Sequence, residues 1–207
     1  HILLMPLEHR SKPLPNDNLA IMDFVNSNDY SVFVNLKGSG ASTPDHLHYQ
    51  GQRRENFPLI NNEFKKSLLA KGNNIDLYSF NQVNSGYFFE YNLEKKEKAS
   101  IALGKIIDSV TEQGLSYNLF FDKNKIFIFP RTREIAIRIP DELKNAGMDK
   151  WQIAGQEMGY LFTAKYKSIF DAITPQALYN SLEDVTLEKS EKKYFDGFLK
   201  EKIKGLI

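Results

Sequence analysis

The sequence predicts an α+β protein in which helices flank an antiparallel sheet. Short apolar runs bounded by turn residues alternate with longer stretches whose apolar residues recur at helical spacing. The order strand, helix, strand, loop, strand occupies residues 1–62, and a similar order returns between residues 87 and 130. We therefore expect two related halves, the second of them degenerate because no histidine lies beyond His48.

The first half opens with an apolar run, residues 2–5, which ends at Pro6 and is typical of a buried strand. Residues 16–27 carry apolar side chains at helical spacing and predict a short helix. Residues 30–35 place valine at every second position, which predicts a second strand. A turn rich in glycine and serine then leads into residues 46–50, for which we expect a third strand.

The second half repeats this order. Residues 87–91 form a strand candidate, and residues 100–113 have the periodicity of a helix that Gly114 stops. Residues 115–121 and 125–129 then flank a short polar loop, which predicts a hairpin.

The remainder of the chain is mostly helical in pattern. Residues 151–164 fit a helix or a strand equally well by periodicity. Thr174 followed by Pro175 predicts a helix start, with threonine as the N-cap and proline at the first position, and the helix should continue to about Asp184. From Glu188 onward, charged residues mix with aromatic and aliphatic ones, which indicates a surface or interface helix.

The expected domain organisation is a catalytic half over residues 1–62 and a second half with C-terminal helices over residues 63–207, with one compact domain as the alternative. The chain opens on His1 in what reads as a strand already under way, without an initiator methionine. We therefore expect an upstream segment that this sequence lacks, or a tag remnant at His1.

Composition excludes several functional classes. The 207 residues carry a formal net charge of +1, which argues against extended nucleic-acid binding. There is no cysteine, so disulfides and thiolate zinc sites are excluded and a cytoplasmic address is the default expectation. No apolar run approaches the roughly 20 residues that span a bilayer, so no membrane partner is expected.

The chemistry of the chain is concentrated in the segment His46-Leu-His-Tyr-Gln50. On a strand, side chains alternate with period two, so both histidines and Gln50 would share one face while the residues between them point to the core. A row of two imidazoles and an amide suits nucleophilic attack by an imidazole on phosphorus, because much of an imidazole is unprotonated near neutral pH.

The glycine-rich turn before this segment could hold the phosphate oxygens. Gly38 and Gly40 permit positive φ, so their successive backbone N–H groups can converge on an anion. Ser39 and Ser42 add hydroxyl donors. The turn lacks the third glycine of a dinucleotide fingerprint and the Gly-Lys-Ser/Thr of a P-loop, so neither motif is predicted.

Two other interpretations of the histidine segment stay open. The first is a polar strand face washed by solvent. The second is a metal site, because His-x-His on a strand is a familiar zinc-ligand pair, with His1 or His9 as a third ligand. We rank phosphoryl chemistry first, the solvated face second and the metal third.

The two motifs together resemble the transferase branch of the histidine-triad superfamily, in which Gly-x-Gly-Ala-Ser precedes His-x-His-x-Gln. That branch holds the galactose-1-phosphate uridylyltransferases, the diadenosine tetraphosphate phosphorylases and the GDP-hexose phosphorylases. Residues 41–50 look most similar to the GDP-hexose phosphorylases, while Asp45 departs from the uridylyltransferase pattern. The resemblance also implies a strand over residues 153–162.

The resemblance implies a histidine-triad-like sheet and specific roles for the site residues. His48 would be the nucleophile that carries a nucleoside monophosphate, Gln50 would bind the phosphoryl oxygens and His46 would orient the site. Phosphate contact or support of the loop would fall to the polar residues of the turn. These are Asn35, Gly38, Ser39, Gly40 and Ser42. Metal-bearing relatives use cysteine ligands that this chain lacks, so no metal or other cofactor is expected.

The predicted function is a two-step nucleotidyltransferase or phosphorylase acting on a nucleoside-diphosphate hexose or a dinucleoside polyphosphate, with phosphate or a sugar phosphate as acceptor. Arg131 and Arg133 could reach that substrate from the second half. A hydrolase of the same superfamily and a non-catalytic nucleotide-binding protein are the alternatives. A homodimer is possible, because the apolar C-terminal helix could be buried in one.

Overall fold

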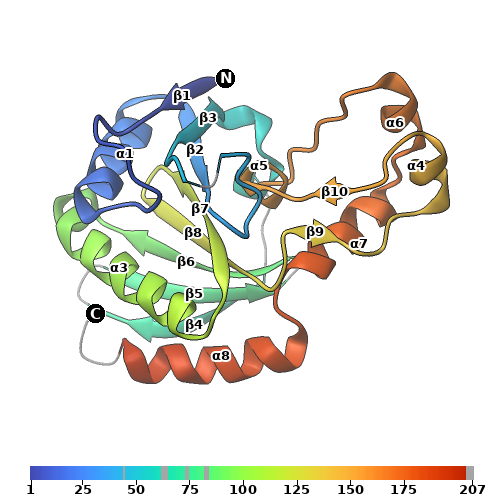
Figure 1. The fold of residues 1–207 in the computed structure, drawn as a ribbon. Helices are drawn as coiled ribbons and strands as arrows, with labels where there is room; N and C mark the ends of the chain where they lie inside the picture. Colours follow the sequence, from blue (N-terminus) through green and yellow to red (C-terminus); the bar gives the residue numbers. More distant parts are fainter. Residues whose placement is uncertain (44, 62–64, 73–74, 82–83, 204–207) are drawn as a thin grey trace.

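The protein is built on a single eight-stranded antiparallel sheet, in the order β1-β3-β2-β7-β8-β6-β5-β4 (Figure 1). The computed structural model describes residues 1–207 except 44, 62–64, 73–74, 82–83 and 204–207. The strands of the sheet are β1 (Ile2–Leu4), β2 (Tyr30–Asn35), β3 (Tyr49–Arg53), β4 (Lys66–Lys71), β5 (Ile75–Asn81), β6 (Ser85–Tyr91), β7 (Ser116–Asp122) and β8 (Lys125–Arg131).

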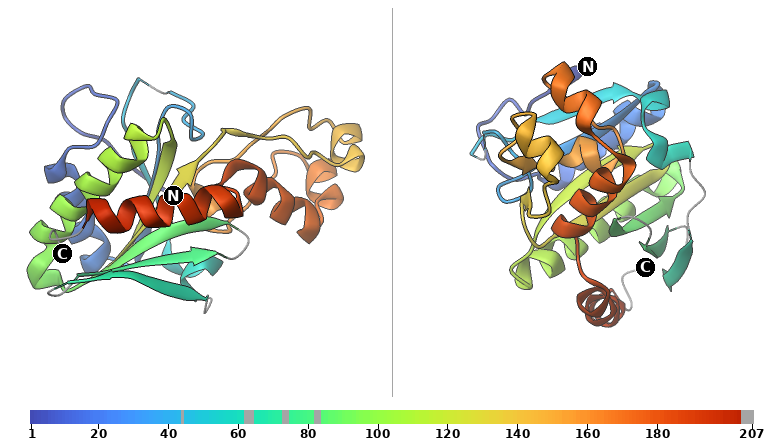
Figure 2. Two further views of the ribbon diagram at one scale, coloured as in Figure 1. Left: turned by 90° about the horizontal axis from the view of Figure 1, so that it is seen from below. Right: turned by 90° about the vertical axis from the view of Figure 1, so that its right-hand side faces the viewer.

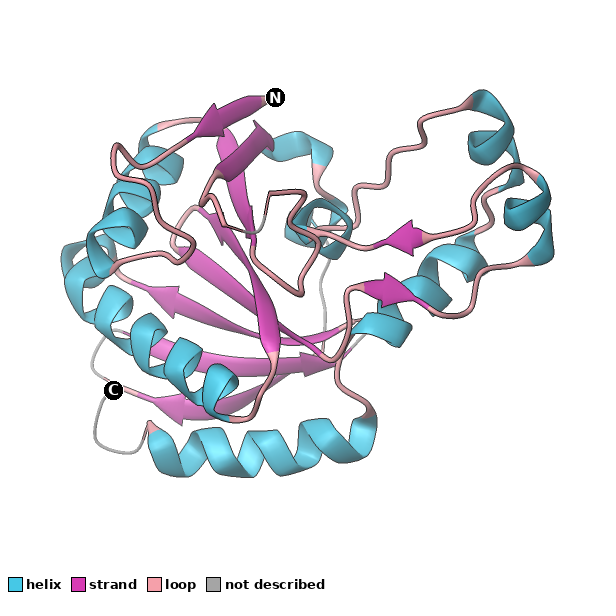
Figure 3. Ribbon diagram, viewed as in Figure 1, coloured by secondary structure: helices cyan, strands magenta, loops and turns pink. Residues whose placement is uncertain are grey.

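Helices lie on both faces of this sheet, as Figure 3 shows by colour. The longer ones are α1 (Pro15–Ser27), α3 (Lys96–Glu112), α7 (Pro175–Val185) and α8 (Lys189–Lys202). The short ones are α2 (Pro58–Asn61), α4 (Asp141–Asn145), α5 (Gly155–Met158) and α6 (Lys167–Ala172). A two-stranded ribbon of β9 (Ile135–Ala136) and β10 (Trp151–Gln152) extends from the sheet with α4, α6 and α7, and the views from two directions agree on this projection (Figure 2).

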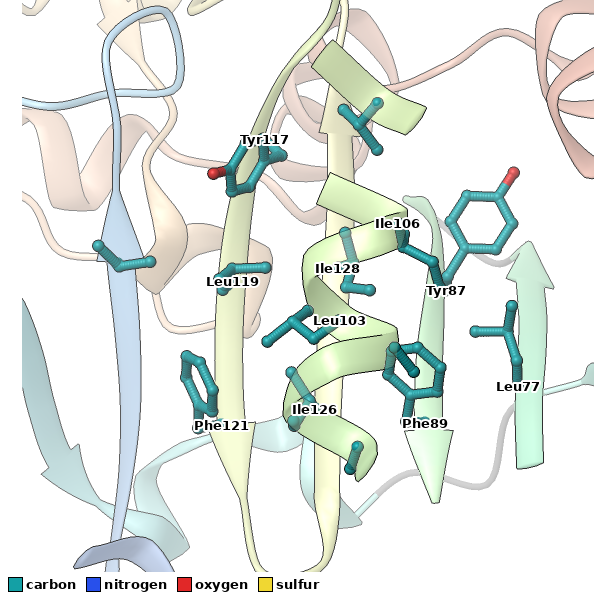
Figure 4. Close-up of a cluster of buried hydrophobic side chains, with 14 of the residues drawn as sticks. Leu77, Tyr87, Phe89, Leu103, Ile106, Tyr117, Leu119, Phe121, Ile126 and Ile128 are labelled. Carbon is teal, nitrogen blue, oxygen red and sulfur yellow. The ribbon is translucent and has the colours of Figure 1, made fainter. Parts of the chain in front are cut away.

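One face of the sheet packs against α1 and α3. Leu103 and Ile106 of α3 point toward this face of the sheet (Figure 4). Every second residue of β7, such as Leu119 and Phe121, projects from the same face. All four side chains are fully buried. Helix α8 closes the same face near β4 through Phe195 and Leu199. The period-two alternation of the strands thus builds the first core.

The opposite face holds a second core that is rich in phenylalanine. Phe33, Phe120 and Phe127 lie there beside Phe57, with ring centroids of Phe57 and Phe120 4.8 Å apart in an edge-to-face arrangement. Helix α5 packs on this face against β2 and β7. Burying aromatic rings on both faces explains how a chain of this length supports so wide a sheet.

Most of the expected elements are confirmed, and the α+β class with an antiparallel sheet and flanking helices is correct. The predicted helices over 16–27, 100–113 and 175–184 correspond to α1, α3 and α7. The Thr174 hydroxyl accepts the Ala177 N–H at 3.2 Å, as its N-cap role requires.

Three expectations were wrong. The first strand, β1, is not buried: it lies at the edge of the sheet, and Leu3 is 53% exposed. The third strand begins at Tyr49 rather than His46, because the preceding segment pairs its backbone with the loop after β1 instead of with a sheet neighbour. The strand implied for residues 153–162 is absent, since those described residues contain helix α5, whose Glu157 carboxylate accepts the Ala154 N–H at 2.9 Å. The hairpin partners β4 and β5 were not predicted from the sequence.

The pairing order of the first unit, β1-β3-β2, is mirrored by β6-β8-β7, and β2 pairs with β7 at the centre. This order agrees with the expected repeat, but two related halves stay a prediction. The expected boundary at residues 62 and 63 lies outside the described residues. Within the described ranges, every helix is too short or too polar to cross a bilayer.

Leu103→Ala should lower the free energy of unfolding by about 2–5 kcal/mol, because the truncation leaves a cavity in the core between α3 and the sheet. Ile101→Ala is the matched control, since Ile101 lies on the same helix with 57% of its surface exposed, and its effect should stay within about 0.5 kcal/mol. Urea unfolding followed by circular dichroism measures both values, and equal losses would contradict the assigned core.

Candidate functional site

His48 lies directly before β3, at the point where the chain enters the sheet. Its neighbours Leu47 and Tyr49 are each 2% exposed and belong to the core on the α1 side. The Leu47 N–H donates to the Arg10 carbonyl at 2.6 Å and holds this segment extended. The expected alternation therefore exists, although the strand itself starts one residue later.

The His48 imidazole is held in one orientation by two contacts. Its Nδ1 lies 3.0 Å from the His46 carbonyl oxygen, and its Nε2 lies 3.3 Å from the Gln50 amide nitrogen. A carbonyl oxygen can only accept, so Nδ1 of the neutral ring carries the proton and Nε2 carries the lone pair. The ring is 8% exposed. Nε2 thus faces the side chain that was expected to bind phosphoryl oxygens.

His46 was expected to orient the site, and the structure shows different positions for its backbone and its side chain. Its backbone carbonyl orients His48, whereas its side chain is exposed and lies beside His9, with ring centroids 5.0 Å apart. In the ranges that the structure describes, no group of three or more histidine, aspartate or glutamate side chains is placed to hold a metal ion.

The polar row continues beyond Gln50. The Gln52 amide donates to the Gln156 side-chain carbonyl at 3.1 Å, and Gln156 belongs to α5 on the phenylalanine-rich face. Both glutamines were missed from the sequence. Gln52 could have been found, because it extends the period-two pattern of His48 and Gln50. Gln156 is 104 residues away from Gln52 and gives no spacing signal.

The glycine turn has the predicted backbone conformation, with φ of +80° at Gly38 and +95° at Gly40. Ser39 is fully buried, and its hydroxyl both accepts the Leu36 N–H at 2.9 Å and donates to the Leu36 carbonyl at 3.0 Å. The Ser39 hydroxyl therefore holds the turn together. Ser42 is exposed and follows the turn directly, and Pro44 lies outside the described residues.

Asn35 fastens the turn to α5. Its side-chain oxygen accepts the Gly155 N–H at 2.6 Å and the Asn118 amide at 3.1 Å. A Cβ on Gly40 would lie 2.8 Å from the backbone of Ile153 and Ala154, so the turn and the start of α5 are in direct contact. The structure thus brings together Asn35, the glycine turn and α5 beside the row that begins at His48.

Beneath this assembly lies Arg131, which is 1% exposed. Its guanidinium donates to the Asn118 side-chain oxygen, to the Ile153 carbonyl at 2.9 Å and to the Val185 carbonyl at 3.2 Å. The Asn118 amide in turn donates to the Ser39 carbonyl at 2.8 Å. Arg131 therefore supports the turn from below and does not face substrate, which corrects the expectation drawn from the sequence.

The buried position changes the acidity of two groups. Burial lowers the pKa of the Arg131 guanidinium to about 9, and the negative potential of Glu157 and Glu134 opposes that shift. Burial also raises the pKa of the Glu157 carboxyl, against the stabilising backbone hydrogen bond from Ala154 and the Arg131 charge. The Arg133 side chain is exposed, while its backbone carbonyl accepts a hydrogen bond from the Arg131 guanidinium at 3.1 Å.

The antiparallel sheet and its flanking helices match a histidine-triad-like fold. Among solved structures, the chain is similar to yeast Ap4A phosphorylase Apa2 in complex with AMP and in complex with Ap4A. Each shows a TM-score of 0.63 and 16% identity, covering 89% of this chain and 68% of the other. The structure of Apa2 alone gives a TM-score of 0.61 and 15% identity, covering 89% and 69%. No family model and no curated protein matches the chain.

Gly40→Ala should destabilise the protein and displace the turn, because the new Cβ meets the backbone at 2.8 Å and φ is +95°. Gly147→Ala is the matched control, since Gly147 has the same φ and nothing within 4 Å of its added Cβ. The control should lose about 1–2 kcal/mol of unfolding free energy from left-handed backbone strain alone. Gly40→Ala should lose about 1–3 kcal/mol more through overpacking. Equal losses in urea melts would disprove the contact.

Proposed function

We propose that the protein transfers a nucleoside monophosphate in two steps through a covalent nucleotidyl-histidine intermediate on His48. The observation that carries the proposal is the orientation of His48, whose Nδ1 is held by the His46 carbonyl so that Nε2 presents its lone pair toward Gln50. An imidazole fixed in one tautomer by a hydrogen bond on its far nitrogen is a prepared nucleophile.

In the first step, Nε2 attacks the α-phosphorus of the donor. A P–N bond forms, and the bond from phosphorus to the bridging oxygen breaks, which releases the remaining phosphate chain or sugar phosphate. In the second step, an oxygen of the acceptor attacks the same phosphorus and the P–N bond breaks, restoring the free imidazole. Two in-line displacements leave the configuration at phosphorus unchanged, and ping-pong kinetics follow.

The groups around His48 supply the electrostatic part of the catalysis. Charge spreads over the equatorial phosphoryl oxygens in the transition state, and fixed donors stabilise it without reorganising. The Gln50 amide, 3.3 Å from Nε2, is placed to donate to such an oxygen once the phosphoryl group arrives. The remaining N–H groups of the glycine turn and the Ser42 hydroxyl are the further donors we assign to the phosphates. The Ser39 N–H is not among them, because it donates to the Leu36 carbonyl at 2.9 Å, and Asn35 and Ser39 support the turn.

The donor we propose is a dinucleoside polyphosphate or a nucleoside-diphosphate hexose, and the acceptor is phosphate or a sugar phosphate. The shared fold with an enzyme solved with Ap4A and with AMP supports the first donor class. The resemblance of residues 41–50 to GDP-hexose phosphorylases supports the second. A cytoplasmic address and a homodimer stay predictions.

Hydrolysis with water as the acceptor is the second candidate. The residue two positions beyond His48 is Gln50, where the hydrolase pattern has a third histidine, and this favours transfer. Measuring nucleotide release with and without inorganic phosphate separates the two reactions, because only a phosphorylase needs the acceptor. Nucleotide binding without turnover with any donor and acceptor would instead establish a non-catalytic protein.

Incubation with Ap4A, GDP-glucose or UDP-glucose should raise the intact mass by one nucleoside monophosphate for at least one donor. His48→Ala should abolish this adduct, since the nitrogen that forms the P–N bond is gone. Intact-protein mass spectrometry after a rapid quench measures both results. The absence of any adduct on the wild-type protein, or an adduct that survives in the variant, would sink the proposal.

His46→Ala should retain adduct formation within about tenfold, because the backbone carbonyl that orients His48 is kept. Gln50→Ala should slow it by a factor on the order of 10²–10³, the cost typical of losing one donor to a transition-state oxyanion. Quenched-flow rates of adduct formation compare the two variants. A larger defect in His46→Ala than in Gln50→Ala would contradict these roles.

A further inference from the structure

We propose that a second, separate site between α8 and the β4–β5 edge of the sheet binds phosphate-bearing anions with two or more linked phosphoryl groups. The site is a pocket of about 360 Å³ lined by residues from three elements or their flanks. They are Lys65, Ser67, Ser79, Lys189, Lys192 and Lys193, together with Phe80 and Asp196. Figure 1 shows α8 beside the β4 edge of the sheet, while β3 lies toward the opposite edge.

The α8 side of the pocket carries three lysines and one aspartate. Lys189, Lys192, Lys193 and Asp196 follow the spacing i, i+3, i+4 and i+7, so they share one face of the helix. The three lysines occupy the first two turns, where the helix dipole is positive and repels cations. A bound anion would relieve that repulsion and would gain from the same dipole.

Only one of these lysines is neutralised by a carboxylate. Lys192 is 6% exposed, and its Nζ donates to both Asp196 oxygens at 2.9 and 3.2 Å. Among the described residues, no carboxylate lies within ion-pair distance of Lys65, Lys189 or Lys193. In the part of the chain that the structure describes, the pocket therefore carries three lysines without a carboxylate partner beside the ion pair of buried Lys192 with half-buried Asp196.

The sheet side of the pocket supplies hydroxyl donors. Ser67 and Ser79 are directly opposite each other in the β4–β5 register, so both side chains project from the same face, toward α8. Lys66, the residue between Lys65 and Ser67, points to the opposite face, where it pairs with Glu90 at 3.1 Å. Because side chains alternate along β4, Lys65 and Ser67 face the pocket, whereas Lys66, which is already paired, faces away from it.

Converging ammonium groups with two hydroxyls suit a multiply charged phosphate chain better than a carboxylate, because each phosphoryl group offers several acceptor oxygens. Inorganic pyrophosphate and the phosphate tail of a nucleotide share this chemistry. The inference stands independently of the reaction proposed for His48, because the pocket contains none of the residues of that site.

Pyridoxal 5′-phosphate tests the site, because its phosphate directs its aldehyde to lysines near an anion pocket. After borohydride reduction, peptide mass spectrometry should find Lys65, Lys189 and Lys193 modified at least fivefold more than exposed Lys98, Lys105 and Lys150. Millimolar pyrophosphate should suppress that labelling. Protection by pyrophosphate alone identifies free polyphosphate as the ligand, whereas protection by ATP alone identifies a nucleotide, and protection by both identifies the shared chain.

Two triple variants with the same change in charge test the pocket by their affinity for pyrophosphate. The triple change Lys65→Gln, Lys189→Gln and Lys193→Gln should weaken pyrophosphate affinity in calorimetry at least tenfold at this site. Lys98→Gln, Lys105→Gln and Lys150→Gln remove the same total charge from exposed positions and should change it less than twofold. Both triple variants should still form the His48 adduct at the wild-type rate. The proposed site would be disproved if lysines were labelled in proportion to their exposure, or if neither pyrophosphate nor ATP reduced the labelling. Equal loss of pyrophosphate affinity in the two triple variants would also disprove it.

Discussion

The buried guanidinium of Arg131 is the constraint on which the arrangement of the candidate site depends. It joins the β7–β8 hairpin, through Asn118 and its own strand, to two segments that follow later in the sequence: the turn at Ile153 and the end of α7 at Val185. Its hydrogen-bond partners are neutral oxygens, so the charge is stabilised by dipoles and by the more distant carboxylates of Glu157 and Glu134 rather than by a direct ion pair. A buried cation held in this way is costly unless every donor is satisfied. The cost makes the local geometry specific, because no other packing of these segments would satisfy the same N–H groups.

The consequence for function is that the glycine turn is fixed before any ligand arrives. Asn118 passes the constraint from Arg131 to the Ser39 carbonyl and to Asn35, and Asn35 receives the first N–H of α5. The turn is therefore held in place by the side chains of Asn35, Ser39 and Asn118. Electrostatic catalysis depends on donors that need no reorganisation when charge develops. Part of the support of the candidate site thus comes from Asn118 and Arg131, far along the chain from His48, the nucleophile that we propose.

The sequence predicted the elements whose signals are local and missed those whose signals are distant. Helix α3 followed from its apolar periodicity and the cap of α7 from Thr174 and Pro175, because each depends on neighbouring residues. Positive φ at Gly38 and Gly40 followed from glycine alone. The strand boundary at Tyr49 did not, because the backbone partner of Leu47 is Arg10, 37 positions earlier. The same limit explains why Arg131 was assigned to substrate: an arginine after a strand is ordinarily exposed, and only the packing of α5 and α7 over β8 buries it.

The strand order also explains why the candidate site lies on β3 and not on β8, which has the matching place in the other part of the sheet. β3 lies between β1 and β2 as β8 lies between β6 and β7, so the two strands occupy matching places. On the phenylalanine-rich face, β3 presents Gln50 and Gln52, whereas β8 presents Phe127, Phe129 and Arg131. The aromatic rings of β8 are covered by the second core, and the guanidinium at its end is consumed by structural hydrogen bonds. Because its side chains are covered in this way, β8 cannot bind a nucleotide. It instead gives rigid support to the polar strand β3. Strand β8 therefore has a structural role, because Arg131 at its end supports the turn through Asn118.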